Sequence, residues 1–142
     1  MTNREMKSKA MGLGNRLSSR MDRREAFVKA WAIVKAGGLE LAVKGVSFAN
    51  RQEALKRLSG YALDQVRAVL VPEPSNPADP VAVAVMVGVQ GGRGLYRLGY
   101  VPANMAAVAS VLGAKLPALH IVSGTWGWAE KTTYGARVAL AV

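Results

Sequence analysis

The chain has 142 residues, of which 51% are hydrophobic, and it carries a formal net charge of +10 at pH 7. This length fits one domain with a hydrophobic core, and the hydrophobic content excludes a disordered tail. The absence of cysteine excludes disulfides, thiolate metal ligands and thiol nucleophiles. No charge-free apolar run approaches the roughly 20 residues of a membrane helix, and residues 1–24 lack the apolar core of a signal peptide. We therefore expect a cytoplasmic protein, with association with the nucleoid as a second option.

The positive charge is concentrated in residues 1–60, which hold 13 lysines and arginines against 5 acidic residues. Residues 61–142 hold 6 lysines and arginines against 4 acidic residues. Basic side chains gain affinity for a polyanion because they release its counterions. The asymmetry favours a nucleic acid or another anionic surface as partner. It leaves open a solvated basic segment that only aids solubility.

The first 38 residues are predicted to precede the main domain. Residues 1–21 show no clean apolar periodicity, so we expect a basic arm that is mobile or weakly helical. A helix should follow over residues 22–38, because Asp22 and Glu25 form a pair like a capping box. Four apolar residues then share one helical face: Phe27, Ala30, Trp31 and Val34. Two glycines beginning at Gly37 should end the helix.

Residues 39–142 are predicted to form a domain that is mainly β with short helices, in the α+β class. The six expected strands cover residues 39–46, 66–71, 81–87, 95–101, 119–128 and 133–142. Helices are expected to start at Asn50, as N-cap, and at Pro102, as first helical residue. Residues 72–80 contain four prolines, which cannot donate to a β-ladder, so they should form a stiff exposed connection. Short strands interrupted by turns and helices are typical of a small barrel or a strongly curved sheet.

Groups suited to catalysis are scarce in this sequence. His120 is the single histidine and lies in an apolar strand pattern, which favours a structural role. The glycine-rich residues 91–94 precede a strand and lack a Lys-Ser/Thr, so they predict a hairpin turn and not a phosphate loop. A metal-dependent nuclease would need clustered acids, and the only candidates are Glu73, Asp79 and Asp64. We expect no enzymatic activity, no metal and no cofactor.

Three segments occur in an order that is typical of one family. They are residues 43–53, 72–85 and 98–102, with the sequences VKGVSFANRQE, PEPSNPADPVAVAV and LGYVP. Together they resemble the HIRAN domain, over about residues 39–142, in its short stand-alone bacterial or phage version. The resemblance implies a six-stranded, OB-like barrel, here preceded by an N-terminal helix. It also implies capture of the 3′ end of single-stranded DNA, as in the fork-remodelling translocases of eukaryotes.

The resemblance implies eight DNA-binding residues. Asp79 would accept a hydrogen bond from a terminal 3′-hydroxyl, although an aspartate in such a turn also often binds its own backbone amides. Phe48 would be a platform on which a base stacks, worth about 1–3 kcal/mol per base, or else a core residue. The other candidates are aromatic or polar contacts and phosphate-binding cations: Ser47, Tyr100, Tyr134, Lys44, Arg51 and Arg97.

Two functions follow from these patterns. The first is a non-catalytic module that binds single-stranded DNA or DNA 3′ ends in DNA repair, replication or mobile-element biology. The second is a protein-interaction or assembly module that keeps the fold without binding DNA. The second is favoured by residues 47–49, which read Ser-Phe-Ala where DNA-end-binding members carry Arg-Tyr-Tyr. It is also favoured by the helix over residues 22–38, whose apolar face could pack on a protein partner or on a second copy.

Overall fold

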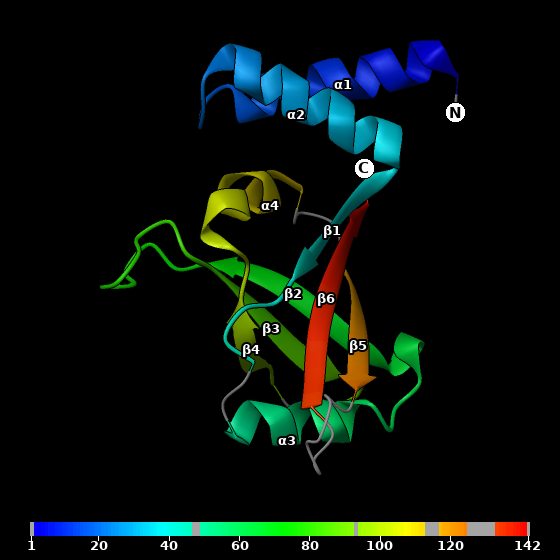
Figure 1. The fold of residues 1–142 in the computed structure, drawn as a ribbon, viewed down its shortest axis with the longest axis vertical. Coiled ribbons are helices and arrows are strands. Elements are labelled where there is room, and N and C mark those ends of the chain that lie inside the picture. The colour runs from blue at the N-terminus through cyan, green and yellow to red at the C-terminus, as the bar shows by residue number, and fades with distance from the viewer. Residues whose placement is uncertain (1, 47–48, 93, 113–116, 125–132, 142) are drawn as a thin grey trace.

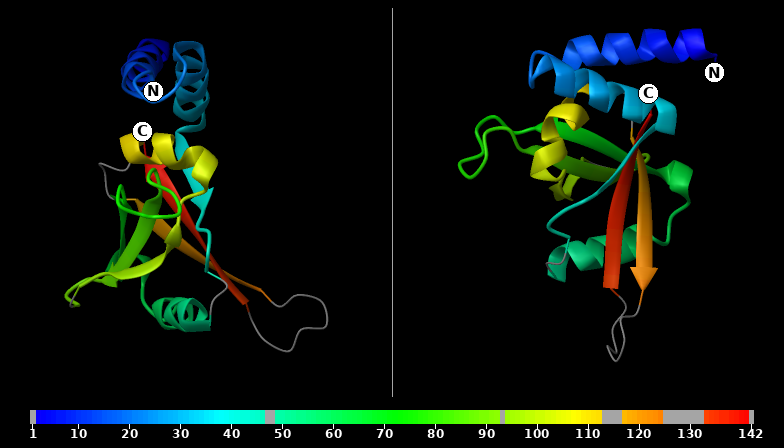
Figure 2. Two further views of the ribbon diagram at one scale, coloured as in Figure 1. Left: turned by 90° about the vertical axis from the view of Figure 1, so that its left-hand side faces the viewer. Right: turned by 45° about the horizontal axis from the view of Figure 1, so that its top comes forward.

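The fold is of mixed α+β type, and the computed structural model describes residues 2–46, 49–92, 94–112, 117–124 and 133–141. These residues form four α-helices and six antiparallel strands. A hairpin of the helices α1 (Asn3–Leu17) and α2 (Arg23–Ala36) lies at one end of the molecule. Helix α3 (Ala49–Leu58) lies at the opposite end, and the strands lie between them (Figure 1 and Figure 2).

Helix α1 replaces the mobile or weakly helical arm that the sequence predicted. The Thr2 hydroxyl accepts a hydrogen bond from the backbone N of Glu5 at 3.2 Å, and the Glu5 carboxylate accepts one from the Thr2 N at 3.3 Å. This capping box fixes the start of the helix. The buried residues of α1 are Ala10, Leu13, Gly14 and Leu17. Half of this face is alanine and glycine, so the apolar periodicity in the sequence is weak.

Helix α2 begins and ends where the sequence predicted. Asp22 Oδ2 accepts hydrogen bonds from the backbone N atoms of Arg24 at 3.1 Å and Glu25 at 3.3 Å, which confirms the predicted cap. Gly37 ends the helix with φ of 80°, a left-handed conformation that favours glycine.

The buried face of α2 is rotated relative to the predicted one. Its buried residues are Ala26, Ala30, Ile33 and Val34. Phe27 and Trp31 are only half-buried. The Phe27 ring lies against Gly14 of α1, where the Cβ of any other residue would overlap it. Helix α1 thus covers part of the face that the sequence analysis offered to a partner.

The six predicted strands are present, but they divide between two antiparallel sheets. The first has the order β1 (Gly38–Ala42), β6 (Thr133–Ala141), β5 (Ala118–Gly124). The second has the order β2 (Val66–Pro72), β3 (Val83–Val89), β4 (Tyr96–Tyr100). The described strands do not close into a barrel, so the α+β class is confirmed and the OB-like barrel is not.

The segment after β1 joins the two sheets. The Val43 N donates to the Ala136 O of β6 at 2.9 Å, and the next residue, Lys44, pairs with Tyr100 of β4. The Lys44 N lies 2.7 Å from the Tyr100 O, and the Tyr100 N lies 2.9 Å from the Lys44 O. Gly99 permits this crossing, because a Cβ at that position would overlap the Lys44 carbonyl oxygen.

The remaining helices start close to the predicted positions. Helix α3 begins one residue before Asn50, the predicted cap. Pro102 precedes a 3-10 turn, η2 (Ala103–Met105), and α4 (Ala106–Leu112) follows it. A second such turn, η1 (Leu63–Gln65), leads into β2. Helix α4 lies between the helical hairpin and the β2–β3–β4 sheet (Figure 1 and Figure 2).

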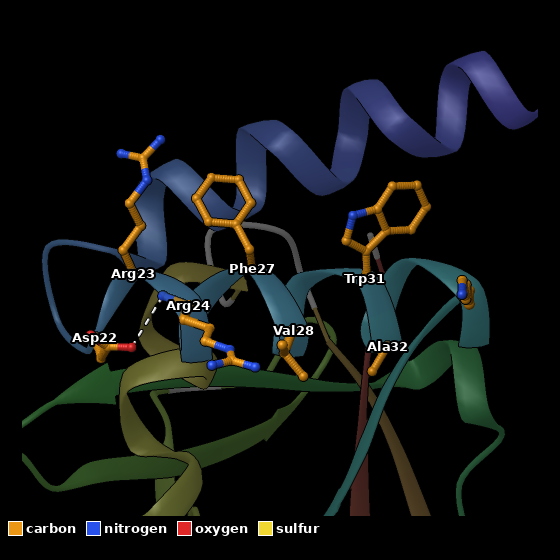
Figure 3. A pocket seen from close by; sticks show the side chains of 8 residues that line it. Asp22, Arg23, Arg24, Phe27, Val28, Trp31 and Ala32 are labelled. Atoms are coloured by element: carbon orange, nitrogen blue, oxygen red, sulfur yellow. Dashed lines mark hydrogen bonds between the residues drawn. The ribbon is translucent and has the colours of Figure 1, made fainter.

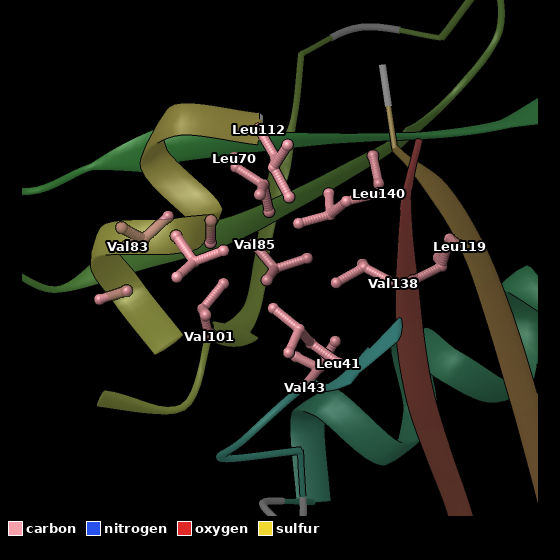
Figure 4. Packing of buried hydrophobic residues seen from close by; sticks show 14 of the residues in the cluster. Leu41, Val43, Leu70, Val83, Val85, Val101, Leu112, Leu119, Val138 and Leu140 are labelled. Carbon is pink, nitrogen blue, oxygen red and sulfur yellow. The ribbon is translucent and has the colours of Figure 1, made fainter. Parts of the chain in front are cut away.

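One hydrophobic core connects all these parts. Side chains from β3 (Val85) and β6 (Val138) project into the space between the two sheets (Figure 4). The same cluster contains Leu13 of α1, Ile33 of α2 and Val108 of α4. The N-terminal hairpin therefore packs as part of the fold, on the core that the sheets share.

Gly99→Ala should lower the free energy of unfolding by about 1–3 kcal/mol, because its Cβ would push on the backbone of the crossing segment. Gly12→Ala is the matched control, since a Cβ built there meets nothing within 4 Å apart from the adjoining backbone of its own helix. That change should stabilise α1, by up to about 1 kcal/mol. Urea unfolding measures both variants, and a Gly99→Ala protein as stable as the wild type would contradict the close approach.

Candidate nucleic-acid interface

The proline-rich connection between β2 and β3 is an exposed loop that projects from the body of the molecule (Figure 1). Backbone hydrogen bonds close it at both ends. The Glu73 N donates to the Ala82 O at 2.9 Å, and the Ala82 N donates to the Asp79 O at 3.1 Å. Within the loop, the Asn76 N donates to the Glu73 O at 3.0 Å. These bonds hold the loop in a defined shape despite its exposure.

The carboxylate of Glu73 connects this loop to strand β4. Its Oε2 lies 2.7 Å from Nη2 of Arg97. Its Oε1 accepts hydrogen bonds from the Tyr100 hydroxyl at 3.0 Å and from the Asn76 amide at 3.1 Å. The Glu73 side chain is 16% exposed, whereas that of Arg97 is 51% exposed. We call Glu73, Asn76, Arg97 and Tyr100 the Glu73 cluster.

The cluster keeps the Glu73 side chain ionised. The Asn76 amide lowers the pKa of Glu73 most, and the Tyr100 hydroxyl and the Arg97 guanidinium lower it further, against an opposing effect of desolvation. Each of these donors stabilises the charged carboxylate more than the neutral acid. At neutral pH the ionised Glu73 can therefore hold Arg97 and Tyr100 in one arrangement.

A hollow of about 470 Å³ lies between the loop and β4. Its lining comprises residues 72–77 of the loop together with Arg97 and Tyr100, so it contains the Glu73 cluster. Lys44 pairs with Tyr100 through the backbone, and Lys44 is exposed. Within the described ranges, the ammonium of Lys44 has no hydrogen bond or ion pair. One cation, Arg97, and one aromatic ring, Tyr100, thus line this hollow, which we call the Glu73 hollow.

Asp79 lies in the same loop and binds the loop's own backbone. Its Oδ1 accepts a hydrogen bond from the Val81 N at 3.0 Å, and its N donates to Oδ1 of Asn76 at 3.1 Å. The structural reading of Asp79 is confirmed by this turn. Oδ2 of Asp79 accepts no hydrogen bond from any residue that the structure describes, so one carboxylate oxygen remains available to a ligand.

Two other predicted site residues lie outside the Glu73 cluster, Arg51 on α3 and Tyr134 on β6 beside α3. Nη1 of Arg51 donates to the Gly45 carbonyl at 2.5 Å, so this guanidinium holds the segment before α3. Tyr134 packs against the core, and its backbone N and O each bind the Gln52 side chain at 2.8 Å.

Two more of the predicted site residues, Ser47 and Phe48, lie outside the described residues. Their predicted roles therefore stay predictions.

The positions that organise the hollow were not predicted from the sequence. Glu73 was a candidate only as one acid of a nuclease, and Asn76 had no predicted role. The available signal was the family pattern itself, because both residues belong to the loop motif that precedes the Gly-Tyr-Val-Pro segment. A carboxylate and an amide in a loop full of prolines are the groups that can fix such a loop to a neighbouring strand.

Other chemical features of the described residues are few. No three of their His, Asp or Glu side chains gather closely enough to hold a metal ion. His120, predicted to be structural, is exposed on β5. None of the helices that the structure describes combines the length and apolar character needed to cross a membrane.

Comparison with protein families decides the identity of this domain. The family model described as the HIRAN domain matches residues 37–118, more than half of the chain. The chain belongs to the HIRAN domain family. The HIRAN match contains the whole Glu73 cluster and leaves out the α1–α2 hairpin and β6. No curated protein and no solved structure matches the chain. HIRAN domains are generally DNA-binding modules, so membership supports nucleic-acid binding.

Glu73→Gln should make the protein less stable at about pH 7, and its deficit relative to wild type should disappear toward about pH 3. The reason is the depressed pKa of Glu73 in the folded state. The Glu73 carboxylate stabilises the folded protein fully at pH values above the pKa that it has in the unfolded chain. This stabilisation is lost as the pH falls through the pKa that it has in the folded protein. Urea midpoints at both pH values measure the deficit.

Glu53→Gln is the matched control for this experiment, since Glu53 is an exposed acid on α3. It should change stability little at either pH. A deficit of Glu73→Gln that is equal at the two pH values would contradict the role of the charged Glu73 carboxylate.

Proposed function

We propose that this HIRAN domain is a non-catalytic module that binds single-stranded DNA at its 3′ end, in DNA repair, replication or mobile-element biology. The observation that carries the proposal is the Glu73 cluster, which holds Arg97 and Tyr100 at a hollow inside the range matched by the family. The excess of basic residues in the first 60 positions supports a polyanionic partner.

The hollow supplies the groups that single-strand binding requires. Arg97 uses Nη2 for Glu73, and the other donors of its guanidinium can reach a phosphate. The Tyr100 ring is held through its hydroxyl, so it can stack a base without first losing rotational freedom. Stacking of this kind contributes about 1–3 kcal/mol per base. The exposed ammonium of Lys44 adds a second positive charge beside Tyr100.

Asp79 supplies a means of distinguishing a 3′ end. The hydrogen bond from the Val81 N orients its carboxylate, and Oδ2 can accept a hydrogen bond from a terminal hydroxyl. A phosphate at the same place would bring two negative charges together and would be repelled. The structural and the ligand-binding readings of Asp79 are therefore compatible.

The alternative is a protein-interaction or assembly module, and one observation favours it. A hollow of about 670 Å³ lies between α3 and the turn from β3 to β4, and its lining includes the exposed Tyr61, Leu95 and Tyr96. Exposed apolar patches of this kind often mark protein contacts. A salt-resistant oligomer in a solution mass measurement, together with no DNA binding, would support this alternative.

Single-stranded oligonucleotides that differ only at their 3′ terminus test the DNA proposal by fluorescence anisotropy. The wild type should bind a 3′-hydroxyl end about tenfold more tightly than a 3′-phosphate end, a difference of about 1.4 kcal/mol. Asp79→Asn should lose this preference and keep its fold, because the amide oxygen can still accept from the Val81 N.

Asp64→Asn, on the exposed turn η1, is the matched control and should keep the preference. No binding at low salt would refute DNA binding. Equal binding of both ends by the wild type would remove the role proposed for Asp79 and leave general single-strand binding.

A further inference from the structure

The α1–α2 hairpin lies outside the HIRAN match but holds much of the excess positive charge. Residues 2–36 contain nine lysines and arginines against three acids. All three acids have partners within the hairpin. Glu5 and Asp22 cap the two helices, and Glu25 forms an ion pair with Lys29 at 3.2 Å. Most of the basic side chains therefore remain without a neutralising acid in the hairpin.

The turn between α1 and α2 lies beside the proline-rich loop. Arg20 of this turn lines a hollow of about 500 Å³ together with Pro74, Pro80 and Val81 of the loop. Figure 1 and Figure 2 show the turn above α4, on the side where the loop projects. Pro74 also lines the Glu73 hollow, so both hollows border the same loop.

A further hollow with basic side chains lies along α2. This broad hollow of about 960 Å³ is lined by Arg24 and by two aromatic residues, each with a cationic side chain close to its ring. The Arg23 guanidinium lies 5.2 Å from the centre of the Phe27 ring, and the Lys35 ammonium lies 5.5 Å from that of Trp31. Arg23, Phe27 and Trp31 project from the same side of α2 (Figure 3). Cations beside aromatic rings suit a nucleic-acid strand, which offers phosphates and bases together.

We propose that Arg20 of the α1–α2 turn and Arg24 in the first turn of α2 bind backbone phosphates of the same strand whose 3′ end lies at the Glu73 hollow. Both side chains are exposed, and neither forms an ion pair within the described ranges. Arg20 lines the hollow that shares Pro74 with the Glu73 hollow, and Arg24 lines the next hollow, along α2. A strand that leaves the Glu73 hollow past Pro74 would therefore meet Arg20 and then Arg24. This inference rests on the proposed function and extends its footprint beyond the family domain.

A nucleic-acid strand fits this surface better than an acidic protein segment does. Arg20 and Arg24 line different hollows, and the hollow of Arg20 shares Pro74 with the Glu73 hollow, which Arg97 lines. Positive groups are therefore spread over three hollows from the loop to α2, an arrangement that suits the repeated phosphates of one strand. An acidic protein segment bound to Arg20 and Arg24 would not require further positive groups at the Glu73 hollow.

Anisotropy titrations with two single-stranded oligonucleotides that end in a 3′-hydroxyl test this inference. Their lengths are about 4 and about 16 nucleotides, the lower and upper limits of the site sizes of single-strand-binding domains. The double variant Arg20→Ala/Arg24→Ala should bind the long oligonucleotide about tenfold more weakly, with a salt slope smaller by about 1.4. It should bind the short one as the wild type does, because the short one does not reach the turn.

Lys56→Ala/Arg57→Ala is the matched control, because it removes two exposed cations from α3 at the opposite end of the molecule. This control variant should bind the short and the long oligonucleotide with the affinities of the wild type. If the wild type binds neither oligonucleotide, the proposed function fails and this inference fails with it. If the wild type binds, and the two double variants bind the long oligonucleotide equally well, the turn is not a DNA contact and only this inference is overturned.

Discussion

The arrangement of the proposed binding surface depends on one carboxylate, that of Glu73. It is the group that joins the proline-rich loop to β4, through Arg97 and Tyr100, and its low exposure strengthens these contacts. Because the two side chains are held before any ligand arrives, binding need not first order them. A loop that projects from the body can in this way present a defined hollow.

A second constraint brings distant parts of the chain to the same place. The close approach at Gly99 lets the segment after β1 pair with β4, which sets Lys44 beside Tyr100. The shared core fixes the α1–α2 hairpin over α4, which sets Arg20 beside the loop. Arg20 and Arg97 therefore border one loop, although 76 residues lie between them in the sequence, and Lys44 lies beside Tyr100 at the same strand.

Local signals in the sequence were enough to predict much of the fold. Strand periodicity, the cap at Asp22 and the stop at Gly37 depend on neighbouring residues, and the structure confirms them. Helix α1 was missed because its buried face is partly alanine and glycine. The division into two sheets depends on pairing between distant strands, which composition does not encode. For the same reason the contacts of Arg51 with Gly45 and of Tyr134 with α3 were not predicted, and the DNA-binding roles of these two residues stay predictions.

The central claim is that nucleic acid binds at the Glu73 hollow. Backbone amide NMR spectra, recorded while a short single-stranded oligonucleotide is added, test it most directly. The largest shift changes should occur at Lys44, Asn76, Arg97 and Tyr100, with little change at Lys56 on α3. An absence of changes, or changes confined to α3, would contradict the claim.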